Sequence, residues 1–140
     1  MSKVFVDTNV LVYALDPQSH KRQQKCREVL RKLSREGQGV ISTQVLQEFY
    51  VASVKKLGVA PLIAKGMMDF FENFEVIQVS PDLIKKAIDC HILNQISFWD
   101  ALIVVSAESA QCEKIWTEDL NPGQTIHGVL IENPLLEFAG

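Results

Sequence analysis

The stretch that decides the fold is KVFVDTNVLVYALD, from Lys3 to Asp16. Its β-branched and aromatic residues predict a short buried strand over Val4–Asp7. The strand ends at a carboxylate, and apolar residues resume at Val10. A charge at the edge of a core costs free energy unless it is compensated. Asp7 is therefore either the N-cap of a short helix over about residues 9–15 or part of a site that attracts a cation.

Short apolar segments alternate with longer amphipathic ones along the rest of the chain. Ser80-Pro81 and Ser97 are typical helix starts, with Ser as N-cap and Pro at the first helical position. The alternation predicts an α/β fold with a parallel sheet flanked by helices, in which ligands bind beyond the carboxyl ends of the strands. The expected helices are residues 20–35, 43–56, 61–73, 81–94 and 98–110, and the further strands are residues 39–42, 74–79, 114–117 and 129–131.

The size and composition favour a soluble globular protein. The 140 residues predict a single domain over 1–140, and 47% hydrophobic with 22% charged residues is ordinary for such a domain. The three cysteines are scattered without a CxxC pair, which argues against a zinc site or disulfides and favours a cytoplasmic protein. We find no signal peptide and no apolar run of the roughly 18 residues that a membrane helix needs, so we expect no membrane partner.

The net charge of −3 conceals an asymmetry between the two parts of the chain. Residues 1–65 hold eleven Lys and Arg against five Asp and Glu, whereas residues 66–140 hold three against twelve. A basic cluster on one predicted helix could attract phosphate, or it could simply be a solvated helix face. The candidate phosphate-binding residues in this cluster are Lys21, Arg22, Lys25, Arg31 and Arg35.

Asp100 lies in SFWDALIVVSAESA, a predicted helix that is apolar on nearly every side. Ile103, Val104 and Ala107 share its face at helical spacing. An ionised carboxylate there costs several kcal/mol unless it is compensated. The alternative is a capping box, in which Asp100 hydrogen-bonds back to the amide of Ser97, although aspartate reaches that amide less well than glutamate.

Two more acidic positions follow strands of the predicted sheet. Glu48 borders the apolar arc of a helix that follows the second strand, and taken alone it could be a solvated residue. Glu118 and Asp119 follow the strand KIWT, and taken alone they could begin a turn. If the first and fourth strands are neighbours, Asp7 and Asp119 meet at the same edge of the sheet.

These acids together predict a site for a divalent cation. Carboxylates held close together raise one another's pKa, and no lysine adjacent in sequence neutralises them. Oxygen ligands without paired Cys or His favour Mg²⁺ or Mn²⁺, as one or two ions. Thr8, Asn9 and Thr117 could orient the carboxylates. Such an ion lowers the pKa of its bound water and neutralises charge on a phosphate, which is the chemistry of phosphodiester hydrolysis.

The motifs VDTNVLVYALD, FWDALIV and IWTEDL, with Glu48 between the first two, resemble the PIN-domain ribonucleases, and most closely the VapC toxins of toxin–antitoxin pairs. The segment GQTIHGVLIENP also looks like the closing strand of that family. The resemblance covers essentially the whole chain. It implies five parallel strands in the order 3-2-1-4-5 and Mg²⁺- or Mn²⁺-dependent endonucleolytic cleavage of RNA.

Carried over by position, the resemblance also assigns residues and partners. The catalytic and metal-binding acids are Asp7, Glu48, Asp100 and Asp119; the supporting residues are Thr8, Asn9 and Thr117, with Glu118 as a possible additional ligand. The resemblance further implies a homodimer and a small antitoxin whose C-terminal segment covers the active site. The apolar residues between Val45 and Phe71 could supply those surfaces or could be ordinary core.

Two other functions stay open. A PIN-like fold with little turnover could serve as an RNA- or protein-binding module. A phosphatase that forms an aspartyl-phosphate would use Asp7 as nucleophile, but such enzymes usually carry a second aspartate two residues later, where this chain has Asn9.

Overall fold

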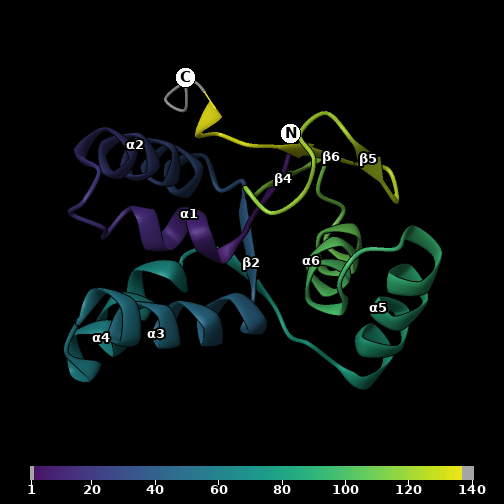
Figure 1. Cartoon of the computed structure of the whole chain (residues 1–140), viewed down its shortest axis with the longest axis horizontal. Coiled ribbons are helices and arrows are strands. Elements are labelled where there is room, and N and C mark those ends of the chain that lie inside the picture. Colours follow the sequence, from purple (N-terminus) through teal and green to yellow (C-terminus); the bar gives the residue numbers. More distant parts are fainter. Residues whose placement is uncertain (1, 137–140) are drawn as a thin grey trace.

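The computed structural model describes residues 2–136 and contains a six-stranded sheet in the order β3-β2-β1-β4-β6-β5. Neighbouring strands run parallel except β5, which pairs antiparallel with β6 at one edge (Figure 1). The predicted order is confirmed for five strands, and β5 is an addition that the prediction lacked. The strands are β1 (Val4–Val6), β2 (Gly39–Ser42), β3 (Glu75–Ile77), β4 (Lys114–Trp116), β5 (Thr125–Ile126) and β6 (Val129–Glu132).

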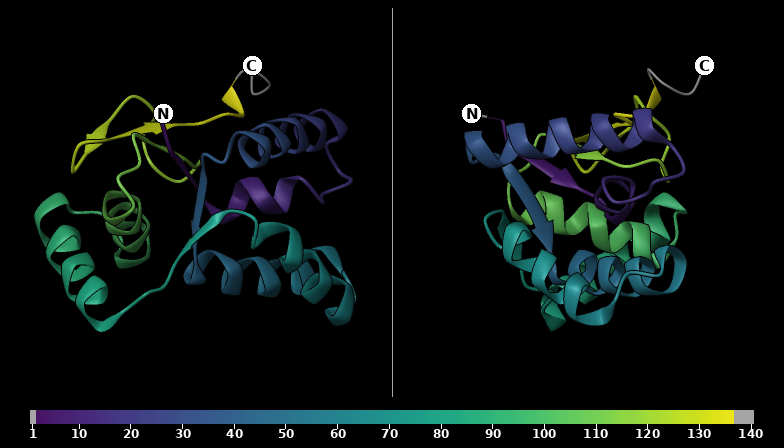
Figure 2. Two further views of the ribbon diagram at one scale, coloured as in Figure 1. Left: turned by 180° about the vertical axis from the view of Figure 1, so that it is seen from behind. Right: turned by 90° about the vertical axis from the view of Figure 1, so that its left-hand side faces the viewer.

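Helices cover both sides of this sheet. Helices α1 to α4 gather on one side, and α5 and α6 on the other, in the two opposed views of Figures 1 and 2. Within residues 2–136, no single helix is long and apolar enough to cross a membrane; α5 and α6 reach that length only together and are bent by 116°. The helices are α1 (Thr8–Tyr13), α2 (His20–Glu36), α3 (Thr43–Leu57), α4 (Pro61–Phe71), α5 (Pro81–Asn94) and α6 (Phe98–Ser109).

Serine side chains cap the starts of four of these helices, and Ser19 caps α2 by accepting from the backbone N–H of Arg22 at 3.4 Å. The hydroxyls of Ser42, Ser80 and Ser97 each accept a hydrogen bond from the backbone N–H three residues later. Each bond satisfies an amide that has no partner within the helix, which is why these serines fix where the helices begin. The start of α3 directly after β2 places Glu48 one and a half turns into the helix, near the edge of the sheet.

The core lies between the sheet and both helix layers. Every residue of β1 and β2 is buried, and seven residues of α6 are buried as well. Phe49 and Phe71 are also core residues, with ring centroids 4.8 Å apart. Tyr50 and Phe70 are exposed, so the apolar residues of α3 and α4 divide between core and surface.

The register of β1 with β4 brings two chain segments together at the carboxyl edge of the sheet. Val6 is paired with Trp116, and the backbone N–H of Asp7 donates to the Trp116 carbonyl at 2.9 Å. Asp7 and Thr117, the first residues after the two strands, are therefore neighbours. The predicted adjacency of the first and fourth strands is confirmed, and it sets the position of the site.

Candidate active site

A cavity of about 890 Å³ opens at the carboxyl ends of β1 and β4. Its walls come from α1, from α3 and from the loop after β4, with Trp99 of α6 at its border. The acidic side chains that line it are Asp7, Asp16, Glu48, Glu118 and Asp119. This is the edge of the sheet where ligands of parallel α/β proteins bind.

Asp7 is the most buried acid of the cavity, with 5% of its surface exposed. Its Oδ1 accepts from the backbone N–H of Thr8 at 2.7 Å, and its Oδ2 accepts from the Thr117 hydroxyl at 2.7 Å. Asp7 is thus the N-cap of α1 as well as a residue of the cavity. Burial raises the pKa of Asp7 to about 7 although both hydrogen bonds lower it, and the charges of Asp119 and Glu48 raise it further.

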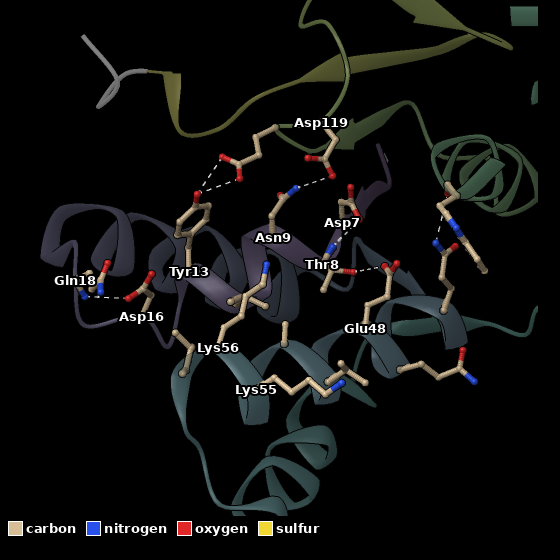
Figure 3. A pocket seen from close by; sticks show the side chains of 18 residues that line it. Asp7, Thr8, Asn9, Tyr13, Asp16, Gln18, Glu48, Lys55, Lys56 and Asp119 are labelled. Carbon is tan, nitrogen blue, oxygen red and sulfur yellow. Dashed lines mark hydrogen bonds between the residues drawn. The ribbon is translucent and has the colours of Figure 1, made fainter. Parts of the chain in front are cut away.

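Residues of the first turn of α1 connect Asp7 to the other acids (Figure 3). The Thr8 hydroxyl donates to Glu48 Oε1 at 2.8 Å, and Asn9 Nδ2 donates to Asp119 Oδ2 at 3.2 Å. The amide oxygen of Asn9 is buried without a hydrogen-bond partner. A buried acceptor without a donor is costly, and a cation or a water molecule bound beside Asn9 would satisfy it.

The loop after β4 is held by Thr117 and by Tyr13. Thr117 is 1% exposed, and its hydroxyl accepts from the backbone N–H of Asp119 at 3.0 Å while donating to Asp7. The Tyr13 hydroxyl donates to both oxygens of Glu118, at 3.0 and 3.2 Å. Burial and the hydrogen bond to Glu118 raise the pKa of Tyr13. The guanidinium of Arg22 lies 5.3 Å from the centre of the Tyr13 ring.

Asp100 lies in the first turn of α6 and is half-buried. Its backbone N–H donates to Ser97 Oγ at 3.0 Å, but no return bond to the Ser97 amide is found among the described residues, so only half of the expected capping box forms. Burial raises the pKa of Asp100, and the charges of Asp119 and Glu48 raise it further. Asp100 is close enough to these two acids to interact with them electrostatically, although it does not itself line the cavity.

The atoms of this site that could bind a metal ion suit a hard divalent cation. Within residues 2–136, no three Asp, Glu, His or Cys side chains lie close enough to bind one metal ion, so the predicted carboxylate cage is more open in this structure than expected. The donors are nevertheless all oxygen atoms, Asn9 leaves an acceptor unsatisfied, and none of the four acids forms a salt bridge with a described Lys or Arg. This chemistry fits Mg²⁺ or Mn²⁺.

The basic residues of the cavity are not those that the sequence pattern suggested. Lys21, Arg22, Lys25, Arg31 and Arg35 all lie on α2, and none of them lines the cavity. Lys55 and Lys56, in the last turn of α3, do line it. The signal that could have found them is their spacing of seven and eight residues from Glu48, which places all three on one helix face.

Comparison with known proteins agrees with this architecture. A toxin–antitoxin complex from Klebsiella pneumoniae superposes with a TM-score of 0.69 at 20% identity, covering 95% of this chain and 98% of that chain. DNA-bound VapBC from Salmonella typhimurium gives 0.69 at 19% identity, covering 96% and 99%. VapC20 of Mycobacterium tuberculosis, a toxin that cleaves the sarcin–ricin loop, gives 0.66 at 17% identity, covering 84% and 90%.

Because the identities are low, these structural matches establish the fold alone. No curated protein matches the sequence. The family model of the PIN domain matches residues 4–125, a span that contains all four acids. The chain belongs to the PIN-domain family.

Proposed function

We propose that this protein is a Mg²⁺- or Mn²⁺-dependent endoribonuclease and the toxin of a type II toxin–antitoxin pair. The observation that carries the proposal is Asp7: a buried carboxylate that faces two further acids and has no cationic partner from the described chain. Such an arrangement is costly to keep unless a cation binds there. Membership of the PIN-domain family and the likeness to VapC20 support the choice of RNA as substrate.

The four acids have distinct parts in this proposal. Asp7 and Asp119 would hold the ion from the ends of β1 and β4, and Glu48 and Asp100 would face it from α3 and α6. The Asn9 amide oxygen would contribute its unsatisfied acceptor. When bound, the ion supplies Lewis acidity that makes water more acidic and neutralises charge on the phosphodiester.

The hydroxyls of Thr8 and Thr117 orient the carboxylates. Thr117 holds Oδ2 of Asp7, and Thr8 holds Oε1 of Glu48, so rotation of either carboxylate breaks a hydrogen bond of 2.7 or 2.8 Å. A carboxylate oxygen can accept more than one hydrogen bond or ligand, so these bonds leave capacity for a cation. Oriented groups of this kind typically increase metal affinity 10- to 100-fold.

We propose two protein partners. The relatives in VapBC complexes support a small antitoxin that covers the cavity. Exposed apolar side chains on two helices supply candidate surfaces for the antitoxin and for a homodimer. On α4 they are Leu62, Ile63 and Phe70; on α5 they are Ile84, Ile88 and Ile92.

The test of the ribonuclease uses the purified chain, free of antitoxin, with a structured RNA and Mn²⁺. Cleavage that stops on chelation, and that is lost in Asp7→Asn and Asp100→Asn variants whose circular dichroism matches the wild type, is the expected result. Asp89→Asn, an exposed aspartate on α5, is the matched control and should cleave normally. Cleavage at the wild-type rate by both site variants would refute the proposal.

An inert wild type under these conditions would favour the alternative, a PIN-fold binding module without useful turnover. The phosphatase alternative gains no support from the site. Enzymes of that class usually carry a second aspartate two residues after the nucleophile, whereas this chain has Asn9 there, and its side-chain amide donates to Asp119.

A further inference from the structure

One face of α3 forms a continuous wall of the cavity. The residues of α3 that line it recur at helical spacing, from Gln44 at the start of the helix through Glu48 to Lys56 at its end. At 1.5 Å per residue, this wall is about 18 Å long. The cavity is therefore better described as a groove along α3, with Glu48 between two ends of different chemistry.

Trp99 stands at the end of the groove where α3 begins. It precedes Asp100 in the first turn of α6, and 61% of its surface is exposed. Its carbonyl accepts from Gln44 Nε2 at 3.4 Å, which ties this turn to α3. Phe98 contacts the indole with ring centroids 5.1 Å apart. Most of the indole surface is nevertheless open to solvent beside the groove.

Lys55 and Lys56 stand at the opposite end. Both are exposed, and neither forms a salt bridge with an acid of residues 2–136. Figure 3 shows the Lys56 side chain extending from α3 into the cavity. Lysines in a last turn also interact favourably with the helix dipole. The helix dipole alone would favour lysines at this position. Here, however, the two lysines also line a groove whose other charged residues are all acidic.

We propose that this groove binds a single-stranded RNA segment, with one unpaired base stacked on Trp99 and backbone phosphates bound by Lys55 and Lys56. The inference rests on the proposed ribonuclease function and extends it to the form of the substrate. Stacking on an exposed aromatic ring requires a base that is free of its duplex, and lysines neutralise phosphates without reading sequence. At about 3.4 Å per stacked nucleotide, the groove spans about five nucleotides, fewer if the strand is extended.

The acids that line the groove make this division of roles necessary. Five carboxylates line the cavity and repel a polyanion, so affinity must come from the ends of the groove and from any bound cation. The strand would thus be held on both sides of Glu48. The phosphodiester to be cleaved would lie between the two points of attachment, next to Glu48.

Binding is tested separately from cleavage, in an Asp119→Asn background with Mg²⁺ present. The probe is a short single-stranded RNA of mixed sequence, compared with the same strand annealed to its complement. The chain has two tryptophans, so adding Trp116→Phe leaves Trp99 as the reporter. We expect the single strand to quench Trp99 fluorescence and to bind more tightly than the duplex.

Each end of the groove has its own signature and its own control. Trp99→Leu should weaken binding about 5- to 150-fold without changing its salt dependence, and Tyr50→Leu, an exposed aromatic of α3 outside the groove, should not. The double change Lys55→Gln and Lys56→Gln should reduce the slope of log affinity against log salt by about 1.4. The matched pair on α5, Lys85→Gln and Lys86→Gln, should leave that slope unchanged.

Three results would overturn the inference while leaving cleavage by the wild type intact. The first is an affinity of the Trp99 and lysine variants for RNA that equals that of the parent protein. The second is a preference for the duplex, and the third is fluorescence of Trp99 that does not respond to RNA. A change of molecular mass in Trp99→Leu without a change in affinity would instead assign Trp99 to a protein contact. If the wild type binds RNA but does not cleave it, the proposed function is refuted and this inference is not.

Discussion

Replacing Asp7 by asparagine should stabilise the metal-free protein at about pH 8 while it abolishes cleavage. Burial raises the pKa of Asp7 from 3.8 to about 7. Because one pKa unit corresponds to about 1.4 kcal/mol, an ionised Asp7 costs the folded state about 4 kcal/mol relative to the unfolded chain. The free energy of unfolding should therefore increase when this charge is removed.

The pH dependence follows from the direction of the shift. Well below the ordinary pKa of 3.8, the carboxyl group is protonated in both states and adds no difference. As the pH rises towards 7, the unfolded chain loses its proton first, so the free energy of unfolding of the wild type decreases. Above about 7 the full cost is present. Asparagine does not titrate, so its advantage grows across the same interval.

The hydrogen bonds of Asp7 reduce the expected gain. An asparagine at this position can accept from only one of the two donors, Thr8 N–H and the Thr117 hydroxyl, with its amide oxygen. Losing one bond to a charged group costs about 1.5–3 kcal/mol. The net stabilisation by Asp7→Asn at about pH 8 should therefore be about 1–3 kcal/mol, and it should vanish or reverse near pH 4.

Urea unfolding in the presence of EDTA measures this difference directly, at about pH 5 and about pH 8, by linear extrapolation. Asp89→Asn, on the exposed face of α5, is the control and should stay within about 0.5 kcal/mol of the wild type at both values. A difference between Asp7→Asn and wild type that does not change with pH would refute the reasoning, because it would mean that Asp7 ionises normally in the folded protein.

Three further predictions concern the metal, the support of Asp7 and the packing of two glycines. Saturating Mg²⁺, at about 100 times its dissociation constant, should raise the free energy of unfolding of the wild type by about 2.7 kcal/mol and that of Asp7→Asn by less, measured by urea unfolding. Thr117→Val removes the donor to Asp7 Oδ2, so it should cost about 1.5–3 kcal/mol and lower kcat in the RNA cleavage assay. Gly39→Ala places a Cβ 2.7 Å from the Phe74 ring and should cost about 1–3 kcal/mol in thermal unfolding, whereas Gly66→Ala, in open space on α4, should stabilise by about 0.5–1 kcal/mol.

Helix positions were predictable where local chemistry determines them. Ser80 and Pro81 specify the start of α5 because a serine cap and a proline at the first position both act within one turn. The end of α4 was less predictable. Residues up to 73 have helical periodicity, but the helix ends at Phe71, and no glycine or proline marks the position.

The hairpin of β5 and β6 was missed for a physical reason. A strand of two residues, Thr125–Ile126, has too few positions to show alternation, and it exists only because it pairs with β6. The turn residues His127 and Gly128 have φ angles of 51° and 78°, as in the tight turns that join antiparallel strands. Glycine adopts this conformation readily and histidine does so rarely, so the sequence signal was weak.

The adjacency of two acids at the candidate site was predictable from the strands. Asp7 and Asp119 could be placed together because each follows a strand, and parallel neighbouring strands end at the same edge. The groove was not predictable, because Trp99 and Lys55 belong to it only through the relative placement of α3 and α6. That placement depends on tertiary contacts such as the bond from Gln44 to the Trp99 carbonyl.

The position of the lysines explains why the cost at Asp7 persists. A lysine beside Asp7 would lower the pKa of the carboxyl group and recover much of the roughly 4 kcal/mol that its ionisation costs. It would also occupy the space that a divalent cation needs. Lys55 and Lys56 instead lie about two helical turns from Glu48, where they can contact a polyanion without pairing with the acids. Asp7 thus has two hydrogen bonds but no cationic side chain beside it, as the proposal of a cation that arrives from solution requires.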